Sequence, residues 1–347
     1  MSVITVLGAG FMGAAVTFPL AAVGHEVRLW GTWLDDPLLE ACRRGPHPRL
    51  HLSLPPAVRL FGADELEPAL AGADALFFGI SSEGFVPVLE RLLPCPAFRP
   101  DLPIFSLTKG FIPWRGAALR AGECAEAMHS ERFPGRPLRW ASIGGPVKAV
   151  ELAQGVPTAS VYALADRSLE SFLPSFRTPF YRVHAGSDLV GLELCATLKN
   201  AYAILLGICD GLFGNAEGRL YDNLKAFLLA KALEEMARIV EAAGGQARTA
   251  FDLPGAGDLY VTAQSGRNRR YGERVGRGED PATAYERMCA GGEIAEGYPA
   301  VRLGSQYLKP RYPGWEERLP VFSTLHRVLA GGAPCGAELE SLVLRYP

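Results

Sequence analysis

The chain has 347 residues, of which 48% are hydrophobic and 21% are charged, the balance of a globular protein rather than a disordered one. Its formal net charge of −2 at pH 7 gives no general reason to expect a nucleic acid or an anionic membrane surface as a partner. This length makes two domains the natural expectation. The seven cysteines are scattered and form no CxxC pair, which argues against a disulfide framework or a metal site and favours a reducing compartment.

A glycine-rich turn follows the first predicted strand, residues 3–7. Gly8, Gly10 and Gly13 form a GxGxxG pattern between this strand and a predicted helix. In this order the first glycine permits the tight turn, the second lets the backbone approach a pyrophosphate, and the third allows close helix–strand packing. Glycine turns also occur without a ligand, but the strand–turn–helix context favours a dinucleotide site, with the pyrophosphate at the helix N-terminus.

The sequence leaves the choice between NAD and NADP open. Residues 25–30 predict the second strand, and its end is where an acidic residue usually contacts the ribose 2′-hydroxyl of NAD. That end reads Trp30-Gly31-Thr32-Trp33, without an acid or an arginine, and Asp35 and Asp36 follow slightly later. The expected cofactor is therefore NAD or NADP.

Short apolar runs alternate with helical patterns from residue 1 to about residue 185. Near-continuous apolar strands joined by helical crossovers are typical of a mainly parallel sheet covered by helices. We therefore predict an α/β fold with an N-terminal, doubly wound Rossmann-type domain over residues 1–185 that binds NAD(P). After the first two, its predicted strands are 58–61, 73–79, 103–107, 140–143, 158–162 and 181–183.

The pattern then changes to long helices. Residues 187–210 predict a helix that Ser187 or Asp188 can cap, and residues 222–243 repeat apolar positions at helical spacing. No convincing strand follows. We predict an all-helical, substrate-binding and catalytic domain over residues 186–347, with a ligand cleft between the two domains.

Two apolar segments invite a membrane interpretation. Residues 189–212 have the length of a membrane span, but Glu193 and Lys199 interrupt them, which favours a buried core helix. The N-terminus lacks the basic region of a signal peptide. We therefore expect no integral membrane segment.

Lys199 is the leading candidate for chemistry. It lies inside the most apolar helix of the chain, where lost hydration disfavours its charged form and lowers its pKa. Such a lysine can donate and accept protons near neutral pH, the task of a general acid or base. The structural alternative is an ion pair with Glu193 or another acid, and the sequence does not decide between the two.

Four residues further along the chain suit a phosphate-bearing ligand. Asp258 lies in a glycine-rich loop that can present its carboxylate, although an ordinary helix N-cap is the structural alternative. Thr262 follows one helical turn later on the same face. Arg267 and Asn268 offer a fork of donors that suits phosphate. A small phosphate ligand explains the arginines around them better than RNA does, so no nucleic-acid partner is expected.

Two further residues lie just beyond the carboxyl ends of predicted strands, the edge where open α/β sheets place ligands. Lys109 follows the strand at 103–107, and its location makes it a candidate ligand. Gly145 follows the strand at 140–143 and is also compatible with a simple turn.

A series of motifs runs along nearly the whole chain. It consists of the N-terminal glycine turn, Thr108-Lys109-Gly110, Gly145-Pro146 with Glu151, Pro157-Thr158-Ala159, Ala196-Thr197-Leu198-Lys199-Asn200, Gly257-Asp258-Leu259, Gly266-Arg267-Asn268-Arg269 and Glu296-Gly297. In this order, the motifs resemble those of NAD(P)-dependent glycerol-3-phosphate dehydrogenases. Each motif alone is a modest signal, whereas the ordered set is very specific.

The resemblance implies an enzyme that interconverts dihydroxyacetone phosphate and sn-glycerol 3-phosphate by hydride transfer with NAD(P)(H). It implies that Lys199 transfers the proton, with Asp258 in support and Lys109 as a second catalytic cation. The implied substrate ligands are Lys109, Gly145, Lys199, Asp258, Thr262, Arg267 and Asn268, the last two holding the phosphate. The implied cofactor ligands are Gly8, Gly10, Phe11, Met12, Gly13, Lys109, Ala149, Arg267 and Glu296. Departures from the family pattern at Phe11-Met12, Val147 and Gly266 concern individual contacts rather than the reaction.

The resemblance further implies a cytoplasmic homodimer whose partner is a phosphorylated three-carbon substrate, in carbohydrate and glycerophospholipid metabolism. The direction of the reaction in the cell stays open. One alternative is a related hydride-transfer enzyme on a carboxylate substrate, such as a β-hydroxyacid dehydrogenase or a ketopantoate reductase. Another is a non-catalytic NAD(P)-sensing protein, which would need no proton donor at position 199.

Overall fold

The computed structural model describes residues 1–214 and 222–346. The chain divides into two units. The sheet unit contains residues 1–112 and 121–189, and the helical unit contains residues 113–120 and the described residues from 190 onward. Residues 113–120 therefore lie between two stretches of the sheet unit in the sequence but belong to the helical unit in the structure. The sequence pattern did not predict this arrangement.

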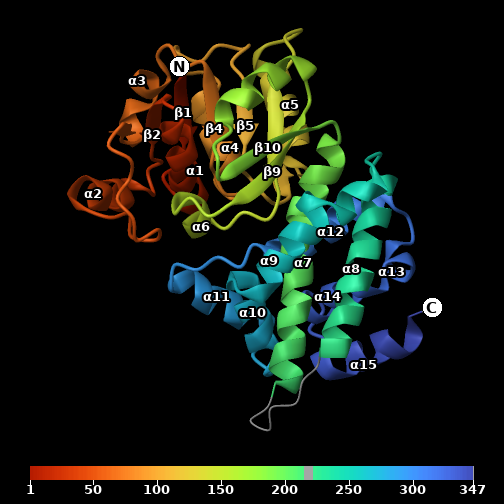
Figure 1. The fold of residues 1–347 in the computed structure, drawn as a ribbon. Helices are drawn as coiled ribbons and strands as arrows, with labels where there is room; N and C mark the ends of the chain where they lie inside the picture. Colours follow the sequence, from red (N-terminus) through yellow and green to blue (C-terminus); the bar gives the residue numbers. More distant parts are fainter. Residues whose placement is uncertain (215–221, 347) are drawn as a thin grey trace. The chain divides into compact units, whose positions relative to one another are not determined.

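Eight strands form one sheet in the sheet unit, in the order β10-β9-β8-β5-β4-β1-β2-β3. Figure 1 labels β1, β2, β4, β5, β9 and β10 of this sheet. All neighbouring strands are parallel except β8 and β9. The prediction of a doubly wound, mainly parallel sheet is confirmed. The strands are β1 (Val3–Leu7), β2 (Glu26–Trp30), β3 (Val58–Phe61), β4 (Ala75–Phe78), β5 (Ile104–Ser106), β8 (Trp140–Gly144), β9 (Thr158–Leu164) and β10 (Tyr181–Gly186).

Helical crossovers join the parallel strands, as parallel pairing requires. The first helix, α1, begins directly after the glycine turn and packs against α6. The helices of this unit are α1 (Phe11–Ala22), α2 (Asp36–Arg44), α3 (Leu66–Leu70), α4 (Phe85–Leu92), α5 (Ala121–Arg132) and α6 (Ala149–Ala153), with 3₁₀ segments η1 (Ala63–Glu65) and η2 (Arg167–Phe176).

Aromatic side chains fill the core against the central strands. Phe77 of β4 and Phe105 of β5 stack with their ring centroids 5.4 Å apart, and the ring of Phe176 lies 5.1 Å from each of them in edge-to-face contact. Each such aromatic pair adds about 0.5–1.5 kcal/mol beyond the burial of its area. This packing holds the central strands, so the loops at their carboxyl ends have fixed starting points.

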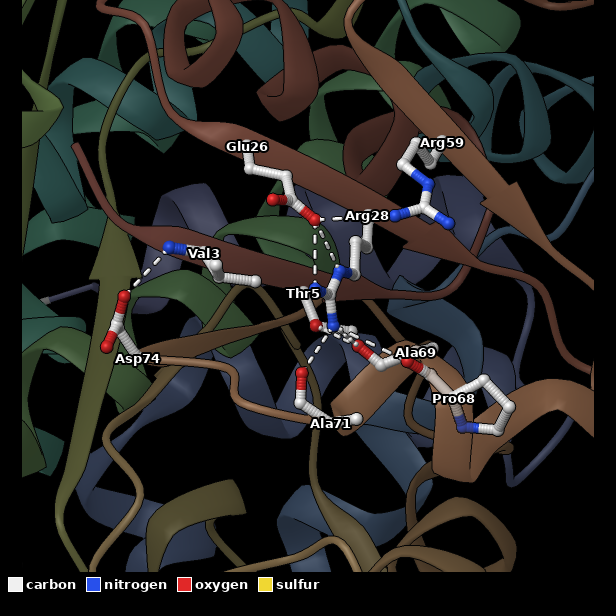
Figure 2. A network of polar contacts seen from close by, with 9 residues as sticks. All are labelled: Val3, Thr5, Glu26, Arg28, Arg59, Pro68, Ala69, Ala71 and Asp74. Carbon is white, nitrogen blue, oxygen red and sulfur yellow. Dashed lines mark hydrogen bonds and ion pairs between the residues drawn. The ribbon is translucent and has the colours of Figure 1, made fainter.

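A polar network joins β1 and β2 to the short helix α3, as Figure 2 shows. Arg28 of β2 donates to the carbonyl of Ala71 at 2.6 Å and pairs with Glu26 at 2.9 Å. Thr5 of β1 donates to the carbonyl of Ala69 at 2.5 Å. The last carbonyls of a helix have no partner within the helix, and these strand side chains supply one, which docks α3 on the sheet.

The helical unit consists of helices and one short hairpin, and no strand follows Gly186 in the part of the chain that the structure describes. The expected all-helical character of this half is thus confirmed, with the hairpin as an addition. Its elements are β6 (Ile112–Trp114), β7 (Ala117–Leu119), α7 (Leu189–Phe213), α8 (Asp222–Ala242), η3 (Ala247–Phe251), η4 (Leu253–Gly257), α9 (Asp258–Gln264), α10 (Arg267–Gly276), α11 (Pro281–Ala290), α12 (Gly297–Arg311), α13 (Trp315–Arg318), α14 (Pro320–Leu329) and α15 (Cys335–Arg345).

Helix α7, drawn in green in Figure 1, is the core helix of this unit. Every residue from Gly191 to Cys209 is buried. By length and composition α7 could cross a membrane, but 89% of its most apolar window is buried inside the protein. This burial agrees with the expected core helix.

Four glycines let α7 and α10 approach closely. Gly207 and Gly211 of α7 face the backbone of α10, and Gly272 and Gly276 of α10 face the backbone of α7. A Cβ atom at any of the four would overlap a carbonyl oxygen of the other helix. Only glycine permits this approach, which holds the first turn of α10 beside α7.

Candidate active site

The glycine turn fits the pyrophosphate of a dinucleotide. Gly8 has φ +98°, a left-handed conformation that residues with a side chain rarely adopt. A Cβ atom at Gly13 would overlap the carbonyl oxygen of Gly8, whereas one at Gly10 would meet no atom within 4 Å. Phe11 and Met12 form the first turn of α1, which carries no acidic residue, and pack partly buried against the core. The backbone N–H groups of this turn can therefore bind an anion.

Lys109 and Gly145 follow β5 and β8, which run parallel to β1, so both lie at the same edge of the sheet as the glycine turn. Lys109 is half-buried. Burial raises the pKa of Tyr181 of β10, and the positive charge of Lys109 acts on that tyrosine in the opposite sense. Gly145 has φ +137° and leads into α6, whose first residue, Ala149, is buried. The structure thus places Lys109 and Gly145 at the expected edge, and Ala149 at the start of the helix that follows Gly145.

Lys199 points from α7 to the first turns of α9. Its ammonium pairs with Asp258 Oδ1 and donates to Thr262 Oγ1 at 3.1 Å. The lysine side chain is 7% exposed and the aspartate 2%, and buried charges of this kind persist only when they are paired. Glu193, the partner considered from the sequence, instead pairs with Arg120 at 2.8 Å.

A π-helical turn delivers Asp258 to this position. Residues Leu253–Gly257 form the turn η4, which runs directly into α9, so Asp258 is the first residue of α9 and not its N-cap. A Cβ atom at Gly255 would overlap the carbonyl oxygen of Ala250, so only glycine allows the turn to pack this closely. Asp258 and Thr262 are four residues apart and share one helix face. The N-cap alternative is therefore wrong.

Asn200, the residue after Lys199, joins α7 to two other helices. Its Oδ1 accepts a hydrogen bond from Asn268 of α10 at 2.9 Å, and its Nδ2 donates to Glu296 at 3.3 Å. Asn268 Oδ1 accepts from the backbone N–H of Gly297, the first residue of α12, at 2.9 Å. The side-chain amide nitrogen of Asn268 carries two N–H donors, and its bond to Asn200 uses one of them. Asn200 stands within one of the family motifs, but no role was predicted for it from the sequence.

Arg267, the first residue of α10, is a partly exposed cation next to this network. Its side chain is 38% exposed, and its Nη2 lies 3.6 Å from Glu296. Exposed pairs at this distance contribute little stability, so the guanidinium can turn to a ligand at small cost. A guanidinium suits the two-oxygen recognition of phosphate.

One buried acid, Glu235 of α8, was not predicted from the sequence. Its carboxylate accepts hydrogen bonds from the backbone N–H groups of Val321 at 2.6 Å and Phe322 at 2.8 Å, and from the hydroxyl of Tyr202 at 3.2 Å. Burial raises the pKa of Glu235 to about 7. Tyr202 lies on α7 three residues after Lys199, so Glu235 ties the lysine-bearing helix to α14.

The signal for Glu235 was in the helical spacing. Position 235 falls on the apolar face of its helix. That face consists of Leu228, Ala232, Met236 and Ile239.

Family models match both halves of the chain. Residues 3–170 match the model described as NAD-dependent glycerol-3-phosphate dehydrogenase N-terminus, and residues 188–340 match the model for the C-terminus of the same enzymes. Together the two models cover nearly the whole sequence.

Individual relatives agree with these models. The chain is 33% identical over 311 residues to the NADP(+)-dependent glycerol-3-phosphate dehydrogenase of Archaeoglobus fulgidus, covering 88% of this chain and 90% of the relative. It is 35% identical over 344 residues to a glycerol-3-phosphate dehydrogenase of Symbiobacterium thermophilum described as using NAD(P)+, covering 98% and 93%. The crystal structure of glycerol-3-phosphate dehydrogenase from Coxiella burnetii superposes with a TM-score of 0.82 at 27% identity, covering 99% of each chain.

The Rossmann-type sheet with its glycine turn and the helical unit with its buried lysine together define a nicotinamide-dependent dehydrogenase. The chain belongs to the family of NAD(P)-dependent glycerol-3-phosphate dehydrogenases. The resemblance read from the motifs is confirmed.

Proposed function

We propose that this protein interconverts dihydroxyacetone phosphate and sn-glycerol 3-phosphate, with residues 1–185 binding NAD(P)(H) and residues 186–347 binding substrate and carrying the catalytic lysine. The observation that carries the proposal is the buried ammonium of Lys199, paired with Asp258 in a chain of this family. A nicotinamide cofactor, when bound, supplies the hydride for C2 of the substrate or accepts it from there.

Lys199 supplies the proton. In the reducing direction, negative charge builds on the carbonyl oxygen of the substrate, and the ammonium stabilises this charge and donates its proton to the oxygen. In the oxidising direction, the neutral amine accepts the hydroxyl proton. Asp258 orients the ammonium and balances its charge, while Thr262 fixes a second N–H direction. General acid–base help of this kind contributes roughly 10²–10⁴-fold to the rate.

Arg267 and Asn268 hold the substrate phosphate at the first turn of α10. Because α10 is packed closely on α7, a phosphate held there has a fixed distance to Lys199, and positioning of this kind lowers the barrier. Lys109 and Gly145 in the sheet unit are further substrate ligands implied by the family. Their part in the reaction, like that of Ala149 and Glu296 toward the cofactor, stays a prediction.

The test is an assay of purified protein with dihydroxyacetone phosphate and NADH or NADPH, following the absorbance of the reduced nicotinamide. We expect oxidation with at least one cofactor, and a comparison of the two KM values gives the preference. Failure with both cofactors would overturn the proposal. Turnover of ketopantoate or another carboxylate substrate in its place would favour a related dehydrogenase. Tight cofactor binding without any turnover would favour a sensor.

Three further parts of the proposal come from the family alone. We propose that the protein is a cytoplasmic homodimer and that its product enters glycerophospholipid metabolism. Light scattering on the purified protein measures its mass in solution, and a mass equal to one chain would contradict the homodimer. Cell fractionation with an antibody measures the location.

A further inference from the structure

The side chains of Asp35 and His47 hydrogen-bond the backbone N–H and the backbone carbonyl of Ala9, a residue of the glycine turn. The backbone N–H of Ala9 donates to Asp35 Oδ2 at 3.2 Å, and the carbonyl of Ala9 bonds His47 Nε2 at 3.0 Å. Ala9 lies between Gly8 and Gly10 and is fully buried. Asp35 precedes α2 and His47 follows it, so the loops at both ends of α2 converge on this one residue.

The bonds of His47 determine its tautomer. Its Nδ1 faces the backbone N–H groups of Arg49 at 3.1 Å and Leu50 at 3.3 Å. Nδ1 must therefore accept, and the proton of the neutral ring is on Nε2, which donates to the carbonyl of Ala9. The side chain of His47 is 0% exposed, and its own backbone N–H donates to the carbonyl of Leu52 at 2.9 Å.

We propose that His47, together with Asp35, is a positioning residue that holds the glycine turn in its cofactor-binding conformation and thereby sets the affinity for NAD(P)(H). This inference rests on the cofactor binding included in the proposed function. Glycines on both sides of Ala9 give this segment wide conformational freedom. With its N–H and its carbonyl both bound, the peptide groups of Ala9 cannot rotate, and the turn is ordered before a ligand arrives, which improves affinity.

His25 provides a matched control on the same sheet. Its Nδ1 accepts from the backbone N–H of Ser2 at 3.2 Å, its Nε2 bonds the carbonyl of Ser175 at 2.8 Å, and it is 5% exposed. The bonding is of the same kind as that of His47. His25 precedes β2, however, and so lies at the edge of the sheet opposite to the glycine turn. A purely structural role predicts equal effects at the two histidines.

Acid pH should weaken the His47 bonds in the wild-type protein. A second proton on Nδ1 would place a donor against the N–H groups of Arg49 and Leu50. Burial lowers the pKa of His47 below its ordinary value of 6.5; the charge of Arg49 acts in the same direction, and the bond to Ala9 and the charge of Asp35 act against it. A lowered pKa favours the neutral ring in the folded state, so its contribution is present above pH 6.5 and is lost as the pH falls below it.

The experiment measures the dissociation constants of NADH and NADPH by nucleotide fluorescence, without substrate, for His47→Leu, His47→Gln and His25→Leu. We expect His47→Leu to raise the constant about ten-fold, the effect of one buried hydrogen bond. His47→Gln, which retains an N–H donor, should recover part of the affinity. His25→Leu should lower the melting temperature similarly and leave the dissociation constant unchanged.

A second pair of variants tests the inference in case His47→Leu does not fold. Asp35→Ala should weaken cofactor binding. Asp36→Ala, which changes the exposed neighbouring residue, is its control and should not. Unchanged affinity in the variants of His47 and Asp35, or an equal loss in His25→Leu, would overturn the inference while leaving the proposed function intact. Wild-type protein that binds cofactor but does not turn over dihydroxyacetone phosphate would overturn the proposed function, and the affinity comparison would still test His47. Binding of neither cofactor would overturn both.

Discussion

Lys199 forms its ion pair with Asp258, 59 residues away in the sequence, and not with Glu193 on its own helix. At 3.6 residues per turn, six residues place Glu193 and Lys199 on different faces of α7. Each face has its own partner, because Glu193 pairs with Arg120 of the hairpin segment. Lys199 therefore lies on the face of α7 that packs against α9, where it meets Asp258.

Lys199→Ala should reduce kcat by roughly 10²–10⁴-fold, because the proton donor is lost. The dissociation constants of NADH and NADPH should stay near the wild-type values, because Lys199 is not one of the implied cofactor ligands and the glycine turn belongs to the other unit. Lys231→Ala, which removes a partly exposed lysine from the ion pair with Glu234 on α8, is the control and should retain wild-type kcat. Wild-type activity of Lys199→Ala would remove this residue from the mechanism.

Asp258→Asn should destabilise the protein by about 3–5 kcal/mol, because it leaves a buried ammonium without its counter-charge. The double variant Lys199→Met with Asp258→Asn removes both charges and should regain most of this loss, while remaining inactive. Urea unfolding of the three proteins measures the difference. A double variant no more stable than Asp258→Asn would show that the two charges are not coupled.

Arg267→Ala should raise the KM for dihydroxyacetone phosphate roughly ten-fold or more, the effect of lost hydrogen bonds to a charged group. Arg270→Ala is a matched control, because Arg270 lies on the same helix, is 52% exposed and pairs with Glu293. Steady-state kinetics at saturating cofactor separates the two. Equal KM values for both variants would contradict the assigned phosphate contact.

Glu235 should make stability depend on pH. Its pKa is raised from 4.5 to about 7 in the folded state, so between these values the folded protein binds more protons than the unfolded chain. The free energy of unfolding should therefore fall, by about 3 kcal/mol, as the pH rises from 4.5 to 7. Glu235→Gln should remove this slope in denaturation curves measured across the range. A slope of opposite sign in the wild type would mean that the two backbone N–H groups outweigh burial.

Gly272→Ala should disturb the contact between α7 and α10, because the added Cβ would overlap the carbonyl oxygen of Ile204. Overpacking of this kind costs about 1–3 kcal/mol or more. Gly291→Ala is the control, since a Cβ there would lie 3.4 Å from the carbonyl oxygen of Met288, in ordinary contact. Thermal melts of the two variants should differ by several degrees. A wild-type melting temperature for Gly272→Ala would show that the two helices can separate without loss.

The sheet could be predicted from the sequence because each strand is a continuous apolar run beside a helical pattern. The hairpin β6–β7 was missed, because its strands have three residues each and Pro113 interrupts the first. Its turn, Arg115-Gly116 with φ +49° and +80°, is a two-residue reversal whose sequence signal is weak outside a longer alternating pattern.

The chemistry of the site could be predicted only in part. An apolar helix containing one lysine indicates that the lysine is special, but its partner depends on tertiary packing, so Asp258 and Glu193 could not be told apart. His47 gave no signal, because a single histidine in a loop has no periodicity that shows what it touches. The spacing of Gly207 with Gly211 and of Gly272 with Gly276 was visible, but its meaning required the two helices to be placed together.

The path of the backbone also decides how this protein can be divided. Residues 113–120 belong to the helical unit although they are encoded inside the sheet unit. A fragment that starts at Val190 would lack Arg120 and leave the carboxylate of Glu193, 4% exposed in the intact chain, without that cation. No single cleavage of the polypeptide separates the sheet unit from a complete helical unit. Producing the helical unit alone requires joining residues 113–120 to the fragment that starts at Val190.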